Sequence, residues 1–233
     1  MFDFQQGEIL LFDKPYTWTS FDLVKKVRNL IRLKKVGHAG TLDPLATGLM
    51  ILCTGAKTKS IESLTGMDKS YTGKFCLGKT TPSYDLETEA DAYFPVDLLR
   101  EDEIRLAASK LTGDLQQLPP AHSAIKVGGK RLYKDARKGI AVKLEPRPVH
   151  VYQFEITGVS LPEVSFNVKC SKGTYIRSLV HDLGKSLGNG AVLTELCRTA
   201  IGDYQLSDAW QLTDFEQTVR KQQAETDAGN SDT

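Results

Sequence analysis

The chain has 233 residues and a formal net charge of +1, with 40% hydrophobic and 25% charged residues. These proportions are those of a soluble globular protein, and the absence of any apolar run near the roughly 20 residues that span a bilayer argues against a membrane protein. Residues 1–6 lack the basic region and the apolar core of a secretory signal. The four cysteines form no C-x-x-C pair, which argues against a zinc site and favours reduced thiols. We therefore expect a cytoplasmic protein.

Basic residues are concentrated in two tracts that the small net charge conceals. Residues 24–59 hold eight lysines and arginines against one acid, Asp43, and residues 121–148 hold eight against Asp135 and Glu145. A single basic run is usually a solvated face. Two such tracts in a nearly neutral chain predict one cationic surface that faces a polyanion.

The predicted elements, in chain order, mix strands and helices. Residues 7–13 are expected to form a short strand, and a helix capped by Ser20 follows. A loop over 36–48 leads into a strand at 49–53 and a helix-like segment at 57–64. We then expect strands at 69–77, 146–159 and 163–170, helices at 101–111, 175–187 and 213–223, and a last strand after residue 190. Residues 224–233 are polar and predicted to be disordered. Because strands and helices do not alternate regularly, the fold class is α+β.

The loop over residues 36–48 contains three glycines, a proline and one carboxylate, Asp43. Pro44 disfavours a helical conformation at Asp43, which should be extended or in a turn. Turn aspartates often serve only to stabilise the local backbone. Lysines and arginines lie on both sides of this loop, so a single acid here also fits a chemical role.

One phosphate-binding motif is present by pattern alone. Residues 73–80 read G-x-x-x-x-G-K-T, which matches a P-loop. That motif requires a strand before the loop and a helix that opens at the lysine, whereas here the pattern lies within a strand-like segment and Pro82 follows closely. A nucleotide phosphohydrolase is therefore a weak alternative.

Residues His38 to Gly48, which read His-Ala-Gly-Thr-Leu-Asp-Pro-Leu-Ala-Thr-Gly, closely resemble the catalytic motif of TruB-type tRNA pseudouridine-55 synthases. In that family the aspartate of the motif attacks the target nucleotide, so the resemblance implies that Asp43 is the nucleophile. It also implies a pseudouridine-synthase fold, in which a mixed, mostly antiparallel central sheet is flanked by helices and loops and the active site lies in a central cleft.

Three further segments resemble signatures of the same family. Lys69-Ser70-Tyr71 matches the strand that carries the active-site tyrosine, which implies that Tyr71 stacks on the flipped base or relays a proton. Residues 170–179 match the signature whose arginine pairs with the aspartate, which implies Arg177 as the partner of Asp43 and Tyr175 as a pocket residue. A guanidinium beside a carboxylate favours the ionised form. In residues 191–199, Leu196 matches the apolar wall of the pocket.

The resemblance also implies a set of substrate contacts. His38 would brace the space left by the flipped base, and Lys14 belongs to a lysine–proline corner near the active site. Lys59 lies in the first basic tract. Lys126, Lys130 and Arg131 lie in an insertion at about residues 120–147 that, in this family, closes over the RNA hairpin. Basic residues of this kind suit contacts to phosphate.

By resemblance, residues 1–212 form the catalytic domain, followed by a helix at 213–223, a tail at 224–233 and no RNA-binding domain of the PUA type. The implied enzyme is an isomerase that converts a uridine in the T-loop of tRNA, position 55, into pseudouridine. Because product and substrate are isomers, no metal and no organic cofactor are expected. The implied partner is the T-arm stem-loop of tRNA, and we expect a monomer with no membrane association and no obligatory protein partner.

A second class of function fits the same basic tracts and aromatic residues. A tRNA-binding folding chaperone would open the RNA elbow without essential chemistry. Asp43 discriminates between the two, because a carboxylate that faces a polyanion weakens binding and is useful only to an enzyme.

Overall fold

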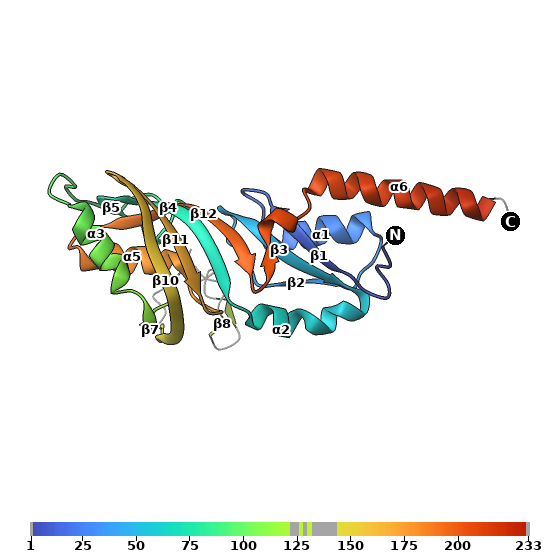
Figure 1. Ribbon diagram of the computed structural model, residues 1–233, viewed down its shortest axis with the longest axis horizontal. Coiled ribbons are helices and arrows are strands. Elements are labelled where there is room, and N and C mark those ends of the chain that lie inside the picture. The colour runs from blue at the N-terminus through green and yellow to red at the C-terminus, as the bar shows by residue number, and fades with distance from the viewer. Residues whose placement is uncertain (1, 122–125, 128–129, 132–143, 232–233) are drawn as a thin grey trace. The chain divides into compact units, whose positions relative to one another are not determined.

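The computed structural model describes residues 2–121, 126–127, 130–131 and 144–231 (Figure 1). The chain divides into two compact units. The first comprises the described residues of Met1–Met67 and Cys197–Thr233, and the second comprises those of Asp68–Leu196. Most of the predicted insertion at 120–147 lies outside the described residues.

The first unit is built around the strand β3 (Ala46–Thr54). Strand β1 (Ile9–Lys14) pairs with β3 antiparallel, with Leu11 opposite Ile51, and β2 (Val36–Ala39) also pairs with β3 antiparallel. Its other elements are α1 (Ser20–Leu30), η1 (Gly55–Ser60), α2 (Ile61–Gly66), β13 (Tyr204–Gln205), η2 (Leu206–Asp208) and α6 (Leu212–Ser231). The last residues of β12 (Ala191–Ile201) complete this unit, and they pair with β13.

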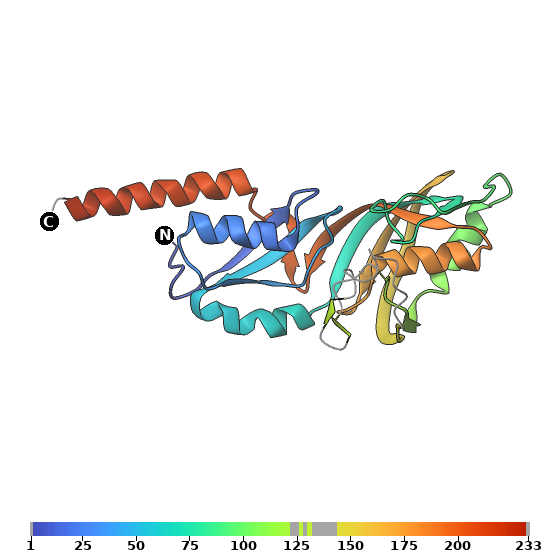
Figure 2. The ribbon, with the colours of Figure 1, turned by 180° about the vertical axis from the view of Figure 1, so that it is seen from behind.

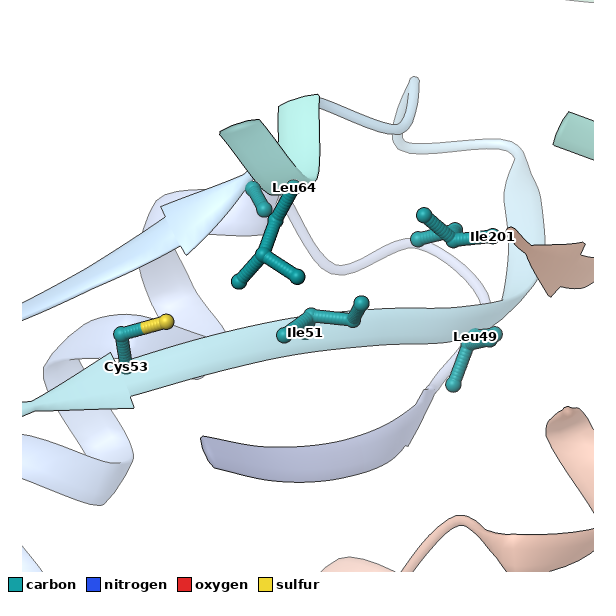
Figure 3. Close-up of a cluster of buried hydrophobic side chains, with 6 residues drawn as sticks. Leu49, Ile51, Cys53, Leu64 and Ile201 are labelled. Carbon is teal, nitrogen blue, oxygen red and sulfur yellow. The ribbon is translucent and has the colours of Figure 1, made fainter. Parts of the chain in front are cut away.

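The core of the first unit forms where β3 meets α2 and the end of β12. Figure 3 shows Leu49, Ile51 and Cys53 on β3 gathered with Leu64 and Ile201. All of these side chains are buried. Side chains at alternate positions of a strand share one face, which explains why three β3 residues two apart enter the same cluster. This packing holds β3 in place, and the loop over residues 40–45 leads into its first residue, Ala46.

The second unit contains a sheet in the order β12, β4, β11, β10, β7, in which β11 pairs antiparallel with β4 and β10, and β10 pairs antiparallel with β7. Its elements are β4 (Lys69–Leu77), β5 (Lys79–Thr80), β6 (Ala92–Tyr93), α3 (Glu101–Ser109), β7 (Gly113–Gln117), β8 (Lys126–Val127), β9 (Lys130–Arg131), β10 (Arg147–Ser160), β11 (Glu163–Cys170) and α5 (Ile176–Ser186). Phe166 on β11 contacts Phe75 and Phe154 from the neighbouring strands, with ring centroids 5.8 and 5.7 Å away. Helix α3 packs on β10, and Figure 2 shows α5, in orange, in front of the strands.

The predicted α+β class and the mostly antiparallel pairing are confirmed. The P-loop alternative is wrong, because strand β5, and not a helix, follows Gly78. The tail predicted to be disordered is helical as far as Ser231, since α6 continues through it. None of the described helices is long and apolar enough to cross a membrane.

The helix cap is also one residue from its predicted position. Thr19, and not Ser20, is the N-cap of α1, and it forms a capping box with Asp22. Both residue types are good caps, so the local pattern could not choose between them. Ser20 is instead the first residue of α1, and its buried hydroxyl donates to Leu42 in the loop that carries Asp43.

Gly48, in the motif residues 38–48, has a backbone that requires glycine. Its φ is +100°, and an added Cβ would lie 2.4 Å from the main-chain oxygen of Arg198. We predict that Gly48→Ala lowers the free energy of unfolding by at least about 2 kcal/mol, because strain and overlap add. Gly66→Ala is the matched control, since nothing lies within 4 Å of its added Cβ. Urea unfolding of both variants measures the difference, and equal midpoints would contradict this prediction.

Candidate active site

Asp43 lies in a six-residue loop, Gly40–Leu45, between β2 and β3. The loop closes in a turn in which the Ala46 amide donates to the Asp43 carbonyl oxygen at 3.1 Å. Asp43 is half-buried, while its neighbours Leu42 and Pro44 are buried and exposed respectively. Side chains from β1, α1 and β12 donate hydrogen bonds to the loop's carbonyl oxygens.

Lys14, at the end of β1, is fully buried beneath the loop. Its ammonium donates to the carbonyl oxygens of Pro15, Trp18 and Pro44 at 2.8, 2.6 and 3.3 Å. Burial lowers the pKa of Lys14 from 10.5 to about 8, and the negative charges of Asp43 and Asp13 oppose that change. Lys14 therefore supports the loop from inside. As the substrate contact predicted from sequence, it would first have to break these three bonds.

Arg198, on β12, binds the other side of the loop and is also buried. Its Nη2 and Nη1 donate to the carbonyl oxygens of Gly40 and Thr41 at 3.2 and 3.4 Å, and its Nε donates to Leu49 at 2.8 Å. Ser20 completes the set: its hydroxyl donates to the Leu42 carbonyl oxygen at 3.1 Å and accepts from the Leu42 amide at 2.9 Å. The backbone on both sides of Asp43 is thus fixed by buried polar groups.

Two more predicted residues of the first unit lie at different depths. His38, on β2, is half-buried; burial lowers its pKa, while a hydrogen bond with the Gly40 backbone opposes that effect and the Arg198 charge adds to it. Lys59, on η1, is exposed, as a contact to phosphate requires. One residue, Ala39, separates His38 from the first residue of the loop, Gly40.

Arg177, the second residue of α5, is the corresponding buried cation of the second unit. Its Nη1 donates to the Ser83 carbonyl oxygen at 3.1 Å, and its Nε lies 3.6 Å from Oδ2 of the buried Asp85. Asp85 is itself held in place, because its carbonyl oxygen accepts from the hydroxyls of Thr81 and Ser83. Removing either member of such a buried pair leaves the other charge uncompensated.

The other predicted residues of the second unit occupy neighbouring elements. Tyr71 is buried on β4, opposite Val168 of β11. Tyr175 is the N-cap residue of α5, and its main chain exchanges two hydrogen bonds with the Gln117 side chain, at 2.7 and 3.0 Å. Leu196 is half-buried on β12. Lys126 and Arg131 face each other across the β8–β9 pair, and Lys130 pairs with Val127; their side chains are outside the described part.

Sequence reasoning missed Arg198 and Asp85. Arg198 follows the apolar run 191–193 by five residues, and only its position within the motif 191–199 set it apart. Asp85 ends the run Thr-Thr-Pro-Ser-Tyr-Asp of residues 80–85. A carboxylate within a run of hydroxyl residues was the available signal.

Comparison with known proteins defines the class of this site. The family model "TruB family pseudouridylate synthase (N terminal domain)" matches residues 28–176, and "tRNA pseudouridylate synthase B C-terminal domain" matches residues 177–229. A protein of Flavobacterium johnsoniae named tRNA pseudouridine synthase B is 48% identical over 94% of this chain and 98% of its own length. A protein of Chlorobaculum tepidum with the same name is 51% identical over 88% of each chain. The chain belongs to the TruB family of pseudouridylate synthases and is therefore an isomerase.

Solved structures agree on the fold. A chain in a Cbf5–Nop10–Gar1 complex superposes with a TM-score of 0.70 at 28% identity, over 92% of this chain and 54% of that one. A chain of the archaeal box H/ACA sRNP Nop10–Cbf5 complex gives 0.69 at 26% identity, over 93% and 54%. This chain thus spans about half the length of those two chains.

The buried Arg198 guanidinium should contribute strongly to stability. We predict that Arg198→Lys lowers the free energy of unfolding by roughly 2–4 kcal/mol, because the compact ammonium cannot place donors at the separate positions of Nε, Nη1 and Nη2, and buried unsatisfied acceptors are costly. Arg220→Lys is the control, since its side chain is exposed and should change stability by less than about 0.5 kcal/mol. Urea unfolding at pH 7 compares them, and similar losses would refute the assigned role.

Lys14 should give stability a defined pH dependence. Between about pH 8 and pH 10.5 the folded chain has lost the Lys14 proton while the unfolded chain retains it, so stability rises with pH there. We predict that the unfolding free energy of the native chain minus that of Lys14→Met increases from pH 8 to pH 10, by up to about 1.4 kcal/mol per pH unit. Lys34→Met, which removes an exposed lysine, is the control. A constant difference for Lys14→Met would show that burial does not shift its titration.

Proposed function

We propose that this enzyme isomerises a uridine in the T-loop of tRNA, at position 55, with Asp43 as the nucleophile. The support for tRNA is the name, tRNA pseudouridine synthase B, of relatives that match 88% or more of the chain. The observation that carries the role of Asp43 is the fixed loop. Its flanking carbonyl oxygens are bound by Lys14, Ser20 and Arg198, which is the preorganisation that a nucleophile needs.

The reaction requires the target base to leave the RNA stack. Extrusion costs a few kcal/mol, and phosphate contacts elsewhere on the RNA can offset it. We propose that these phosphate contacts are made by Lys59 of the first basic tract and by Lys126, Lys130 and Arg131 of the insertion. His38 would brace the space that the base leaves. Tyr71 would stack on the flipped uracil, because an aromatic face accepts a base without reading its edges.

Arg177 is proposed as the ion-pair partner of Asp43, with Tyr175 and Leu196 shaping the pocket. These roles rest on the matched motifs. The hydrogen bond of Arg177 to Ser83 and its pairing with Asp85 support the proposal, because they restrict where the guanidinium can lie. The N-glycosidic bond breaks, the base turns and a carbon–carbon bond forms, so no atoms are gained or lost. Neither a metal nor an organic cofactor is needed for that balance.

The decisive experiment compares the native chain with Asp43→Asn on a T-arm stem-loop and on full-length tRNA. We predict that Asp43→Asn lowers pseudouridine formation at least about a thousandfold, as removal of a nucleophile does, while RNA binding persists. Asp203→Asn, in an exposed turn, is the matched control and should retain full activity.

The outcomes separate the two classes of function. Product from the native chain and none from Asp43→Asn, with both bound to RNA, establishes the isomerase and its nucleophile. Binding of both without product from either, on both RNAs, would favour the folding chaperone. Turnover by Asp43→Asn would show that another group attacks the nucleotide.

A further inference from the structure

A stacked pair of rings in the second unit lies next to the Arg177 anchor. Tyr84, in the connection between β5 and β6, stacks on His181 of α5 with ring centroids 3.8 Å apart and planes inclined by 16°. His181 follows Arg177 by four residues, which places both side chains on one face of the helix. Tyr84 stands between Ser83 and Asp85, the two residues that bind Arg177. One face of α5 therefore holds three consecutive residues of the connection.

The conformation of Tyr84 explains why both of its neighbours can reach Arg177. Its φ of +65° lies in the left-handed region, which a residue with a Cβ rarely adopts. This local turn allows the Ser83 carbonyl oxygen and the Asp85 carboxylate to approach the same guanidinium. Two main-chain bonds hold the turn: the Tyr84 amide donates to Thr81 at 3.1 Å, and the Tyr84 carbonyl oxygen accepts from Leu193 at 3.0 Å.

Burial alternates along the connection, as expected if one side of it packs against α5. Thr81, Ser83 and Asp85 are all buried, while Pro82 and Leu86 are exposed and Tyr84 is half-buried against the helix. Burial lowers the pKa of His181, an effect that the Asp182 charge opposes, and burial raises the pKa of Tyr84. Both rings are thus favoured in their neutral forms. Neutral rings can stack without the free-energy cost of removing water from a charged group.

We propose that the Tyr84–His181 stack is a positioning element that holds Ser83 and Asp85 in place and, through them, sets the orientation of Arg177 for catalysis. This inference rests on the proposed role of Arg177. The stack touches neither the base nor Asp43 in this role; it acts only through the connection. Its loss should reduce the rate of the chemical step and leave RNA binding unchanged, because neither ring belongs to the residues proposed for phosphate contacts.

The test uses the full chain with tRNA and three variants. Tyr84→Leu removes the flat ring and keeps the Cβ, Tyr84→Phe restores the ring, and Tyr93→Leu removes an exposed tyrosine of β6 as a matched control. We expect Tyr84→Leu to lower kcat about tenfold or more, as small misplacements of catalytic groups do. Its KM and its Kd for tRNA should stay within about twofold of the native values, and Tyr84→Phe and Tyr93→Leu should have near-native kcat.

A double-mutant cycle with Asp85→Asn distinguishes positioning from general stability. If the stack acts through Asp85, Tyr84→Leu should cost little more once Asp85→Asn is present, whereas a purely structural effect would add in full. Full additivity, a change in KM or Kd alone, or equal losses from Tyr84→Phe and Tyr84→Leu would each overturn the proposal. If Tyr84→Leu does not fold, His181→Gln removes the other ring and is subject to the same criteria.

The native chain and Asp43→Asn are assayed in parallel, which separates this inference from the proposed function. Native turnover that Asp43→Asn abolishes, together with native-like kcat in Tyr84→Leu and His181→Gln, would overturn the positioning role alone. An inactive native chain would overturn both proposals.

Discussion

Burial of a positive charge among main-chain carbonyl oxygens is the interaction on which the rest of the first unit depends. Lys14 and Arg198 are both buried, and each donates to three carbonyl oxygens. A buried cation is costly unless its donors are satisfied, so these contacts must form together with the fold. The same contacts fix Gly40, Thr41 and Pro44 around Asp43. Because the buried charges must keep these hydrogen bonds, the carbonyl oxygens of the loop are held in one arrangement.

The second unit uses the same device with one addition. Arg177 donates to a carbonyl oxygen, as Lys14 and Arg198 do, and it also lies beside a buried carboxylate, Asp85. These three cations are buried, whereas Lys59 remains exposed. Basic residues in this chain thus differ in burial: Lys14, Arg198 and Arg177 organise backbone from buried positions, and the side chain of Lys59 lies in solvent. A count of basic residues in the sequence cannot separate the two, because burial depends on contacts distant along the chain.

Local patterns in the sequence predicted what local physics controls. Glycine and proline spacing identified the loop of Asp43, although β2 and β3 take up residues 36–39 and 46–48 of the predicted segment. Alternation identified β4, and the apolar positions of residues 175–187 identified α5. The roles of Arg198 and Asp85 could not be predicted in this way, because their partners lie far along the chain. The helical tail was missed for a different reason. Residues 224–231 carry no apolar face, and only continuation from the packed start of α6, where Phe215 and Val219 are buried, extends the helix there.

Strand β12 supplies support to both loops from one short segment. The Leu193 amide binds the carbonyl oxygen of Tyr84 in the second unit, and Arg198 binds Gly40 and Thr41 in the first. A shift of one residue in strand register turns every side chain to the opposite face and moves every main-chain donor. Such a shift in β12 would displace Arg198 from its carbonyl oxygens and would remove the Leu193 amide from Tyr84. Each contact therefore depends on the register of the part of β12 that makes it.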